Sequence, residues 1–88
     1  MDVALADFPA VVKEIRNTLG LSQEDLARQI GVSFATVNRW EKQLAKPSRL
    51  AINQIESFCA REVEHQRLPS ELVTALIRSI KLGKITRE

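Results

Sequence analysis

Hydrophobic residues recur at helical spacing in five segments of the 88-residue chain, and no segment shows the alternation of a convincing β-strand. The first helix is expected to begin near Asp7, because Pro9 is tolerated in an opening turn, and to end at Gly20, a common C-terminal cap. Its apolar positions are Val11, Val12, Ile15 and Leu19.

A short second helix is expected next, because Ser22 has the sequence context of a helix N-cap. Leu21 precedes this serine and Leu26 follows it by four residues. This spacing predicts a hydrophobic staple, in which the residue before the cap packs on the fourth residue of the helix. Asp25 occupies the position that closes a capping box, so the start of the second helix is well marked.

Ser33 repeats the same pattern, with Val32 before it and Val37 four residues after it. The third helix is therefore expected to run from Phe34 to Glu41. Only residues 31–33 separate it from the second helix, and so short a connection forces a sharp angle between the two.

Two longer helices are expected in the second half of the chain. The fourth begins around Pro47 and Ser48, and its apolar residues are Leu50, Ile52, Ile55, Phe58 and Cys59. Residues 61–67 are rich in glutamate and arginine and read as a solvated extension or a linker. The fifth helix follows residues 68–70 and is expected to end at Gly83; its apolar stripe comprises Leu72, Val73, Leu76, Ile77 and Ile80.

Length and composition narrow the class of protein. Eighty-eight residues suffice for one domain, and 44% hydrophobic and 27% charged residues are typical of a globular protein. No apolar run approaches the roughly 20 residues of a membrane span. The N-terminus lacks the basic region of a signal peptide, and a single cysteine excludes an internal disulfide. We therefore expect a cytoplasmic protein with no membrane partner.

The net charge of +2 is unevenly distributed along the chain. Residues 33–49 and residues 78–88 each carry a net charge of +3, whereas residues 1–32 and 50–77 each carry −2. Two basic stretches on an otherwise acidic chain indicate a localised anionic partner. A solvated face followed by a basic tail is the alternative that charge alone leaves open.

Residues 34–42, projected as a helix, have two chemically different sides. Val37 and Trp40 share one side and are suited to a core. In a DNA major groove, arginine reads guanine, asparagine reads adenine and an apolar side chain contacts the thymine methyl. The other side offers these groups, since it carries Phe34, Ala35, Asn38, Arg39 and Lys42.

Three stretches of the chain resemble the lambda repressor and Cro family of helix-turn-helix proteins, which in bacteria is often named the xenobiotic-response-element class. They are IRNTLGLSQEDLA at 15–27, IGVS at 30–33 and TVNRWE at 36–41. The resemblance covers about residues 8–60. It implies an all-α, lambda-repressor-like DNA-binding domain of four to five helices over residues 1–60, with the helix-turn-helix formed by the second and third. Residues 61–88 would be a linker and a C-terminal helix of the same compact unit.

The resemblance also implies roles for particular residues. The expected base contacts, with Arg39 the best candidate for a specific one, are Ser33, Phe34, Ala35, Asn38 and Arg39. The expected phosphate contacts are Gln23, Lys42, Lys46 and Arg49. Arg16 and Glu41 occupy the positions of a structural ion pair between the first helix and the end of the third.

The chain departs from its relatives at two places. Residues 42–47 lack the glycine that many relatives have after the third helix. Phe34 and Ala35 replace polar residues that read bases in well-known members, so more of the readout is expected from Asn38, Arg39 and DNA shape.

Other chemistry finds little support. Cys59 and Trp40 are expected in the core. Cys59, Glu62 and His65 are poor candidates for a metal site, because no second cysteine or histidine cluster accompanies them. With one histidine and no paired nucleophile and base, we expect no enzyme activity, cofactor or small-molecule ligand.

These observations predict sequence-specific binding of double-stranded DNA, most simply by a dimeric prokaryotic repressor that associates with the nucleoid. Residues 70–82 are expected to complete the core, to form the dimer contact, or to do both. One alternative is a DNA-targeting N-terminal module of a larger DNA-acting protein. Another is an antitoxin or protein-interaction adaptor, suggested by the apolar Phe34 and Ala35.

Overall fold

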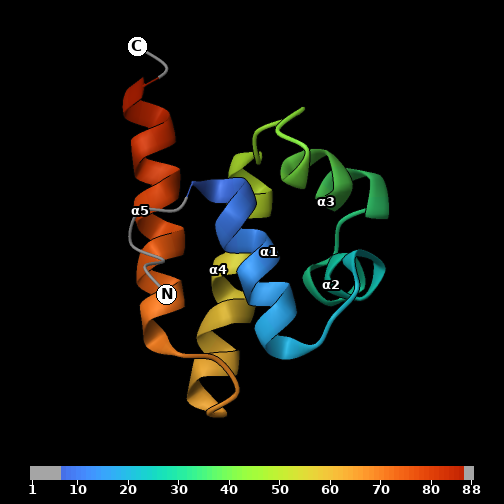
Figure 1. Ribbon diagram of the computed structural model, residues 1–88, viewed down its shortest axis with the longest axis vertical. Coiled ribbons are helices and arrows are strands. Elements are labelled where there is room, and N and C mark those ends of the chain that lie inside the picture. The colour runs from blue at the N-terminus through green and yellow to red at the C-terminus, as the bar shows by residue number, and fades with distance from the viewer. Residues whose placement is uncertain (1–6, 87–88) are drawn as a thin grey trace.

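Five α-helices and no strand make up the part of the chain that the computed structural model describes, residues 7–86, with side chains described for residues 7–81. They are α1 (Phe8–Leu19), α2 (Gln23–Ile30), α3 (Phe34–Glu41), α4 (Arg49–Glu64) and α5 (Ser70–Thr86). The predicted all-α class is confirmed, and the third helix has the predicted bounds (Figure 1).

Each of the first four helices begins at a side chain that caps it. The oxygens of Asp7, Ser22, Ser33 and Ser48 accept hydrogen bonds of 3.0–3.1 Å from the backbone N–H three residues later. Asp25 completes a capping box by accepting the backbone N–H of Ser22 at 3.4 Å. Such caps contribute about 1 kcal/mol each, and here they fix where α2 and α3 start.

The turn between α2 and α3 depends on Gly31, whose φ of 80° lies in the left-handed region. The N–H groups of Gly31 and Val32 both donate to the carbonyl of Ala27, at 2.9 and 3.0 Å, which ends α2. A Cβ at position 31 would also stand 3.1 Å from the side-chain nitrogen of Gln54 on α4. The left-handed conformation therefore favours glycine here, and a larger residue would in addition require the Gln54 side chain to shift.

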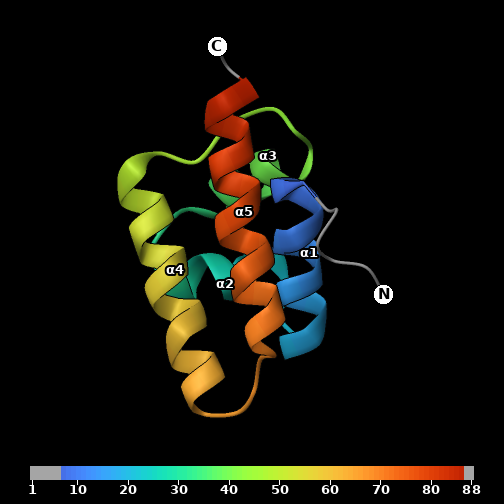
Figure 2. The same cartoon turned by 90° about the vertical axis from the view of Figure 1, so that its left-hand side faces the viewer.

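The core forms around α1, which has α3 on one side and α5 on the other (Figures 1 and 2). Val11, Val12 and Ile15 of α1 are completely buried. Trp40 of α3 is 1% exposed, and its ring meets that of Phe8 edge to face at 5.4 Å between centroids. The expected core positions of Trp40 and Cys59 are confirmed.

Two expectations about the second half of the chain need correction. The expected end of the fifth helix at Gly83 is wrong, because α5 continues to Thr86. A glycine inside a helix lowers helix stability by only about 1 kcal/mol relative to alanine. It ends a helix as a C-terminal cap only where it adopts the left-handed conformation. One expected apolar residue on each of the two long helices also faces outward, since Leu50 of α4 is 68% and Ile77 of α5 36% exposed. The rest of the expected α5 stripe is confirmed, because Leu72 and Leu76 are buried and Val73 and Ile80 pack against the core.

Candidate nucleic-acid interface

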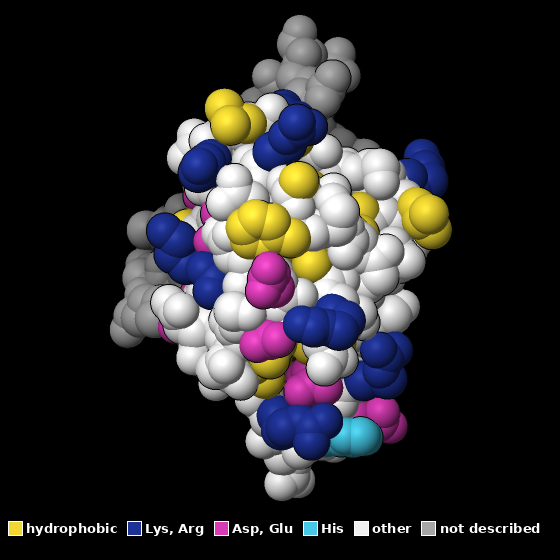
Figure 3. Space-filling model, turned by 90° about the vertical axis from the view of Figure 1, so that its right-hand side faces the viewer, with side chains coloured by type: hydrophobic (Ala, Val, Ile, Leu, Met, Phe, Trp, Pro, Cys, Tyr) yellow, Lys and Arg dark blue, Asp and Glu magenta, His cyan; other side chains and the backbone are white. Residues whose placement is uncertain are grey.

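The two sides of α3 face different environments. Val37 and Trp40 are buried, whereas Phe34 is 48% exposed and Ala35, Arg39 and Lys42 are also exposed. Asn38 is half-buried. Figure 3 faces the α2–α3 side: over α3 and the loop after it, Lys and Arg side chains are interspersed with exposed hydrophobic ones, whereas further down acidic and basic side chains are mixed.

Arg16 of α1 and Glu41 at the end of α3 form a bidentate ion pair. The Nε and Nη2 atoms of Arg16 donate to the two carboxylate oxygens of Glu41 at 2.6 and 2.8 Å. The remaining Nη1 donates to the carbonyl of Leu21, just before α2, at 3.1 Å. Only 15% of the Arg16 side chain and 4% of the Glu41 side chain are exposed, so solvent screens the pair less than a surface pair.

Two residues expected to contact DNA, Gln23 and Asn38, are hydrogen-bonded to each other. Gln23 Nε2 donates to Glu41 Oε1 at 2.9 Å, and Gln23 Oε1 accepts from Asn38 Nδ2 at 3.0 Å. Arg16, Glu41, Gln23 and Asn38 thus form one chain of hydrogen bonds, named here the amide chain. Sequence reasoning missed it, because a helical projection of α3 says nothing about which α2 side chain lies beside Asn38.

Ser33 combines its expected place at the interface with a structural task. Its hydroxyl accepts the backbone N–H of Thr36 at 3.1 Å and lies 2.9 Å from the Thr36 hydroxyl. Ser33 is nevertheless exposed at the start of α3. The cap therefore holds this hydroxyl in a fixed position at the edge of the α3 surface.

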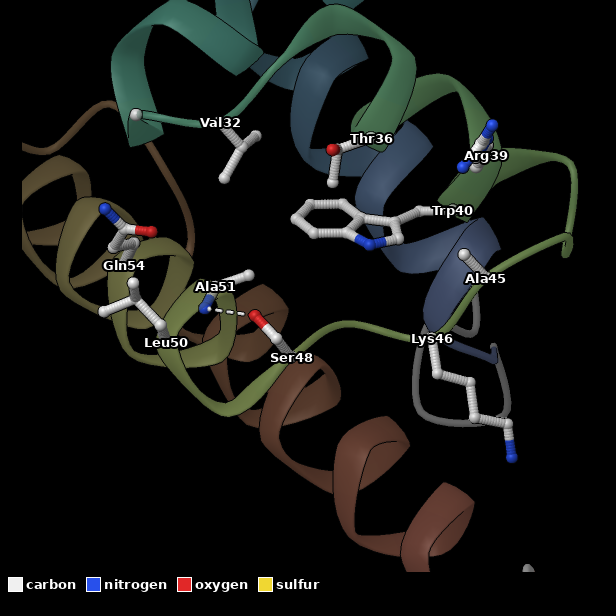
Figure 4. A pocket seen from close by; sticks show the side chains of 11 residues that line it. Val32, Thr36, Arg39, Trp40, Ala45, Lys46, Ser48, Leu50, Ala51 and Gln54 are labelled. Carbon is white, nitrogen blue, oxygen red and sulfur yellow. Dashed lines mark hydrogen bonds between the residues drawn. The ribbon is translucent and has the colours of Figure 1, made fainter.

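An open hollow of about 390 Å³ lies between α3 and the start of α4. Its base contains buried Trp40 and Ala51. Figure 4 shows Arg39 and Lys46 on one side of the hollow, and Leu50 and Gln54 on the other. Two of the residues expected to contact DNA, one on α3 and one in the loop, therefore share the rim of one depression.

The other basic residues follow α3 along the chain. Lys42 is the C-cap of α3, and Arg49 is the first residue of α4. Both are exposed, as is Lys46 between them. Within this loop, which lacks a glycine, Gln43 adopts the left-handed conformation with φ of 62°, so the loop turns sharply away from α3.

The remaining candidates for chemistry lie on α4. Burial, followed by the charges of Glu62 and Glu56, raises the pKa of the Cys59 thiol to about 12. Glu62 accepts two hydrogen bonds from Arg67, at 2.8 and 3.2 Å, and His65 caps the helix. The described residues contain no group of three metal-binding side chains. Nor does a helix among them have the length and apolarity needed to cross a membrane.

Comparison with known proteins agrees with this geometry. Two short helices joined by a tight turn, with the second one exposed, are the arrangement of the helix-turn-helix class. The model of the helix-turn-helix family matches residues 12–64, and the chain belongs to this family. It is 36% identical over 52 residues to an uncharacterized HTH-type transcriptional regulator of Methanothermobacter thermautotrophicus, a match that covers 59% of this chain and 75% of that protein. No solved structure matches at the same level of significance.

Proposed function

We propose that this protein binds double-stranded DNA of a particular sequence and regulates transcription, with α3 in the major groove. One observation carries the proposal: α3 buries Val37 and Trp40 and turns Phe34, Ala35 and Arg39 outward, beside exposed basic residues. A recognition helix needs such a face, because base edges can be read only by side chains that project into the groove. The name of the Methanothermobacter relative, an HTH-type transcriptional regulator, supports the regulatory part of the proposal.

Two groups of side chains have different tasks in this proposal. The base contacts are made by Ser33, Phe34, Ala35, Asn38 and Arg39. The phosphate contacts are made by Gln23, Lys42, Lys46 and Arg49. Phosphate contacts supply affinity and orientation without sequence information, and base contacts select the site. Gln23 can still donate to a phosphate, because its hydrogen bond to Glu41 uses only one N–H of its amide group.

The simplest regulatory mechanism is repression by occlusion. Two copies place their α3 helices in successive major grooves, about 34 Å apart, on a roughly palindromic operator and exclude other proteins from it. Residues 70–82 are our candidate for the contact between the two copies. The same interface on one copy also suits a DNA-targeting module of a larger protein.

The proposal is tested by selection from a random duplex DNA pool at about 150 mM salt, because phosphate affinity depends on salt. A two-fold symmetric enriched motif is expected. A single short half-site would instead indicate a monomeric targeting module. The absence of any enriched sequence, with circular dichroism showing a folded helical chain, would overturn DNA recognition.

A second candidate function is an adaptor or antitoxin that binds a protein through the same side of the molecule. Three exposed large hydrophobic side chains favour it: Phe34 at 48%, Leu44 at 71% and Leu50 at 68% exposure. Exposed large apolar side chains can form the desolvated centre of a protein–protein contact. A stoichiometric partner that co-purifies, together with no salt-sensitive DNA binding, would support this function over the first.

A further inference from the structure

The amide chain has a direction that is set by the charge at one end. A carboxylate only accepts hydrogen bonds, and Arg16 holds Glu41 in its charged form through two bonds of 2.6 and 2.8 Å. Gln23 must therefore turn its NH₂ group toward Glu41, at 2.9 Å, and its oxygen away. With the opposite orientation, two oxygens without a proton between them would face each other.

The orientation of Gln23 determines that of Asn38. Gln23 Oε1 only accepts, so Asn38 must turn its Nδ2 toward it, at 3.0 Å. The Asn38 carbonyl oxygen then points away from Gln23 and accepts no hydrogen bond from any of the described residues. Asn38 is half-buried on the α3 face, so its Oδ1 and its second N–H are the groups left for a partner outside the protein.

We propose that Glu41 is a specificity-positioning residue that acts through Gln23 to orient the Asn38 amide, so that its oxygen selects a base with an exocyclic amino group. This inference rests on the proposed function. An acceptor at Oδ1 matches adenine N6 or cytosine N4 on the contacted strand, and it opposes guanine O6 and thymine O4. With its second N–H, Asn38 can also bind adenine N7, which makes adenine the preferred base.

The test measures Kd values for a selected operator and its single base-pair substitutions. Asn38→Ala first identifies the base pair that Asn38 reads, as the one whose preference disappears. At that base pair the wild-type protein is expected to prefer adenine on the contacted strand by about tenfold. Glu41→Gln and Gln23→Met are each expected to reduce this preference toward unity and to leave preferences at other base pairs intact.

Two matched variants control for charge and helix content. Glu24→Gln removes the same charge as Glu41→Gln from an exposed position, and Gln29→Met makes the same change as Gln23→Met elsewhere on α2. Both are expected to keep the base preference. Gln23→Met leaves the Arg16–Glu41 ion pair in place, so it remains informative even if Glu41→Gln does not fold.

A direct effect of Glu41 on Asn38 must be separated from the relayed one, because the two residues are three positions apart on α3. In the Gln23→Met background, Glu41→Gln is expected to cause no further change at the Asn38 base pair. The proposal is overturned if a further change occurs there. It is also overturned if Glu41→Gln weakens all sequences equally with the preference intact, or if Asn38 selects guanine or thymine.

The amide chain can also be tested without DNA. In the NMR spectrum of the free protein, the side-chain amide signals of Asn38 are expected to shift in Glu41→Gln but not when this change is made in the Gln23→Met background. If random-pool selection finds no DNA sequence while these shifts appear, the proposed function fails and the orienting relay stands. Unchanged Asn38 signals in Glu41→Gln would remove the relay itself.

Discussion

Gln43 and Gln66 occupy the same place at the ends of two different helices. Their φ angles of 62° and 61° lie in the left-handed region, where glycine is the usual residue. Each turn is closed by a bond across six residues, from Leu44 N–H to Arg39 O at 2.9 Å and from Arg67 N–H to Glu62 O at 2.8 Å. The chain thus forms the helix ends that glycine would form, at an energetic cost.

We predict that Gln43→Gly and Gln66→Gly each stabilise the protein. Glycine adopts the left-handed conformation without the strain of about 1 kcal/mol that glutamine has there. Part of this gain is lost because glycine has a larger conformational entropy in the unfolded state, so the net stabilisation is about 0.5 kcal/mol for each substitution. The double variant should unfold several degrees higher than wild type in a thermal melt. Gln43→Ala keeps the strain and is expected to leave the melting temperature nearly unchanged, and a lower melting temperature for both glycine variants would contradict the argument.

The pH dependence of stability reports on Glu41. Burial raises the pKa of this carboxyl, but hydrogen bonds from Arg16 and Gln23 and the charges of Arg16 and Lys13 bring it below its ordinary value. The stabilisation that ionised Glu41 contributes is therefore fully present when the pH is above the unfolded-state pKa of about 4.3. It is lost as the pH falls through the lower pKa that Glu41 has in the folded state.

We expect the free energy of unfolding of the wild type to fall more steeply in this acidic range than that of Glu41→Gln. Denaturant titrations at a series of pH values from about 7 to 3 measure both curves. If the two curves run parallel, the ion pair contributes nothing that depends on pH.

At the scale of the element, the proposed function assigns base reading to α3 and phosphate contact to the loop after it, and a pair of truncations tests this division. Arg39→Ala, on α3, is expected to cost about 1–3 kcal/mol on the preferred DNA site and little on random DNA. Lys46→Ala, in the loop, is expected to weaken all sequences alike and to reduce the slope of log K against log salt by about one. Equal losses of Arg39→Ala on both DNAs would exclude it from base reading, and an unchanged slope would exclude Lys46 from phosphate contact.

The helices could be predicted from the sequence because their limits are encoded locally. Ser22, Ser33 and Gly31 act on groups within a few residues, so their patterns are visible along the chain. The end of α5 could not be predicted in this way. Whether Gly83 stops a helix depends on the conformation it adopts there, and glycine is compatible with both outcomes.

The candidate interface could be predicted only in part, because local patterns show which residues face outward but not which residues of different helices contact one another. The outward positions of Phe34, Ala35 and Arg39 follow from helical periodicity. The hydrogen bonds of Gln23 to Glu41 and Asn38 do not, because the short turn predicts a sharp angle between α2 and α3 but not which side chains of the two helices meet. The family resemblance supplied the Arg16–Glu41 pairing, which spans 25 residues of sequence and lies beyond any local pattern.

At the scale of the whole molecule, α5 packs on α1 on the side away from α3, which makes it part of the core (Figure 2). Leu76 of α5 is completely buried, whereas its neighbour Ile77 is 36% exposed. The inner face of α5 is thus already occupied within one chain. Over residues 70–81, whose side chains the structure describes, the outer face of α5 remains for a contact with a second copy.

We predict that Leu76→Ala costs about 2–5 kcal/mol of stability, because it leaves a cavity in the core. Ile77→Ala is expected to cost less than about 1 kcal/mol in the monomer. Urea unfolding at several protein concentrations measures both. A loss for Ile77→Ala that depends on protein concentration would place that side chain in a contact between two copies.

Trp40 is the only tryptophan in the chain, and it is buried against Phe8 while also forming part of the base of the hollow beside Arg39. Its indole therefore connects the interior to the surface proposed to receive DNA. The intrinsic fluorescence of Trp40 is therefore expected to report the docking of α3 on α1 during unfolding, and to change when DNA binds beside Arg39. Tryptophan fluorescence can thus test both the folding of the protein and the proposed DNA binding without an attached fluorophore.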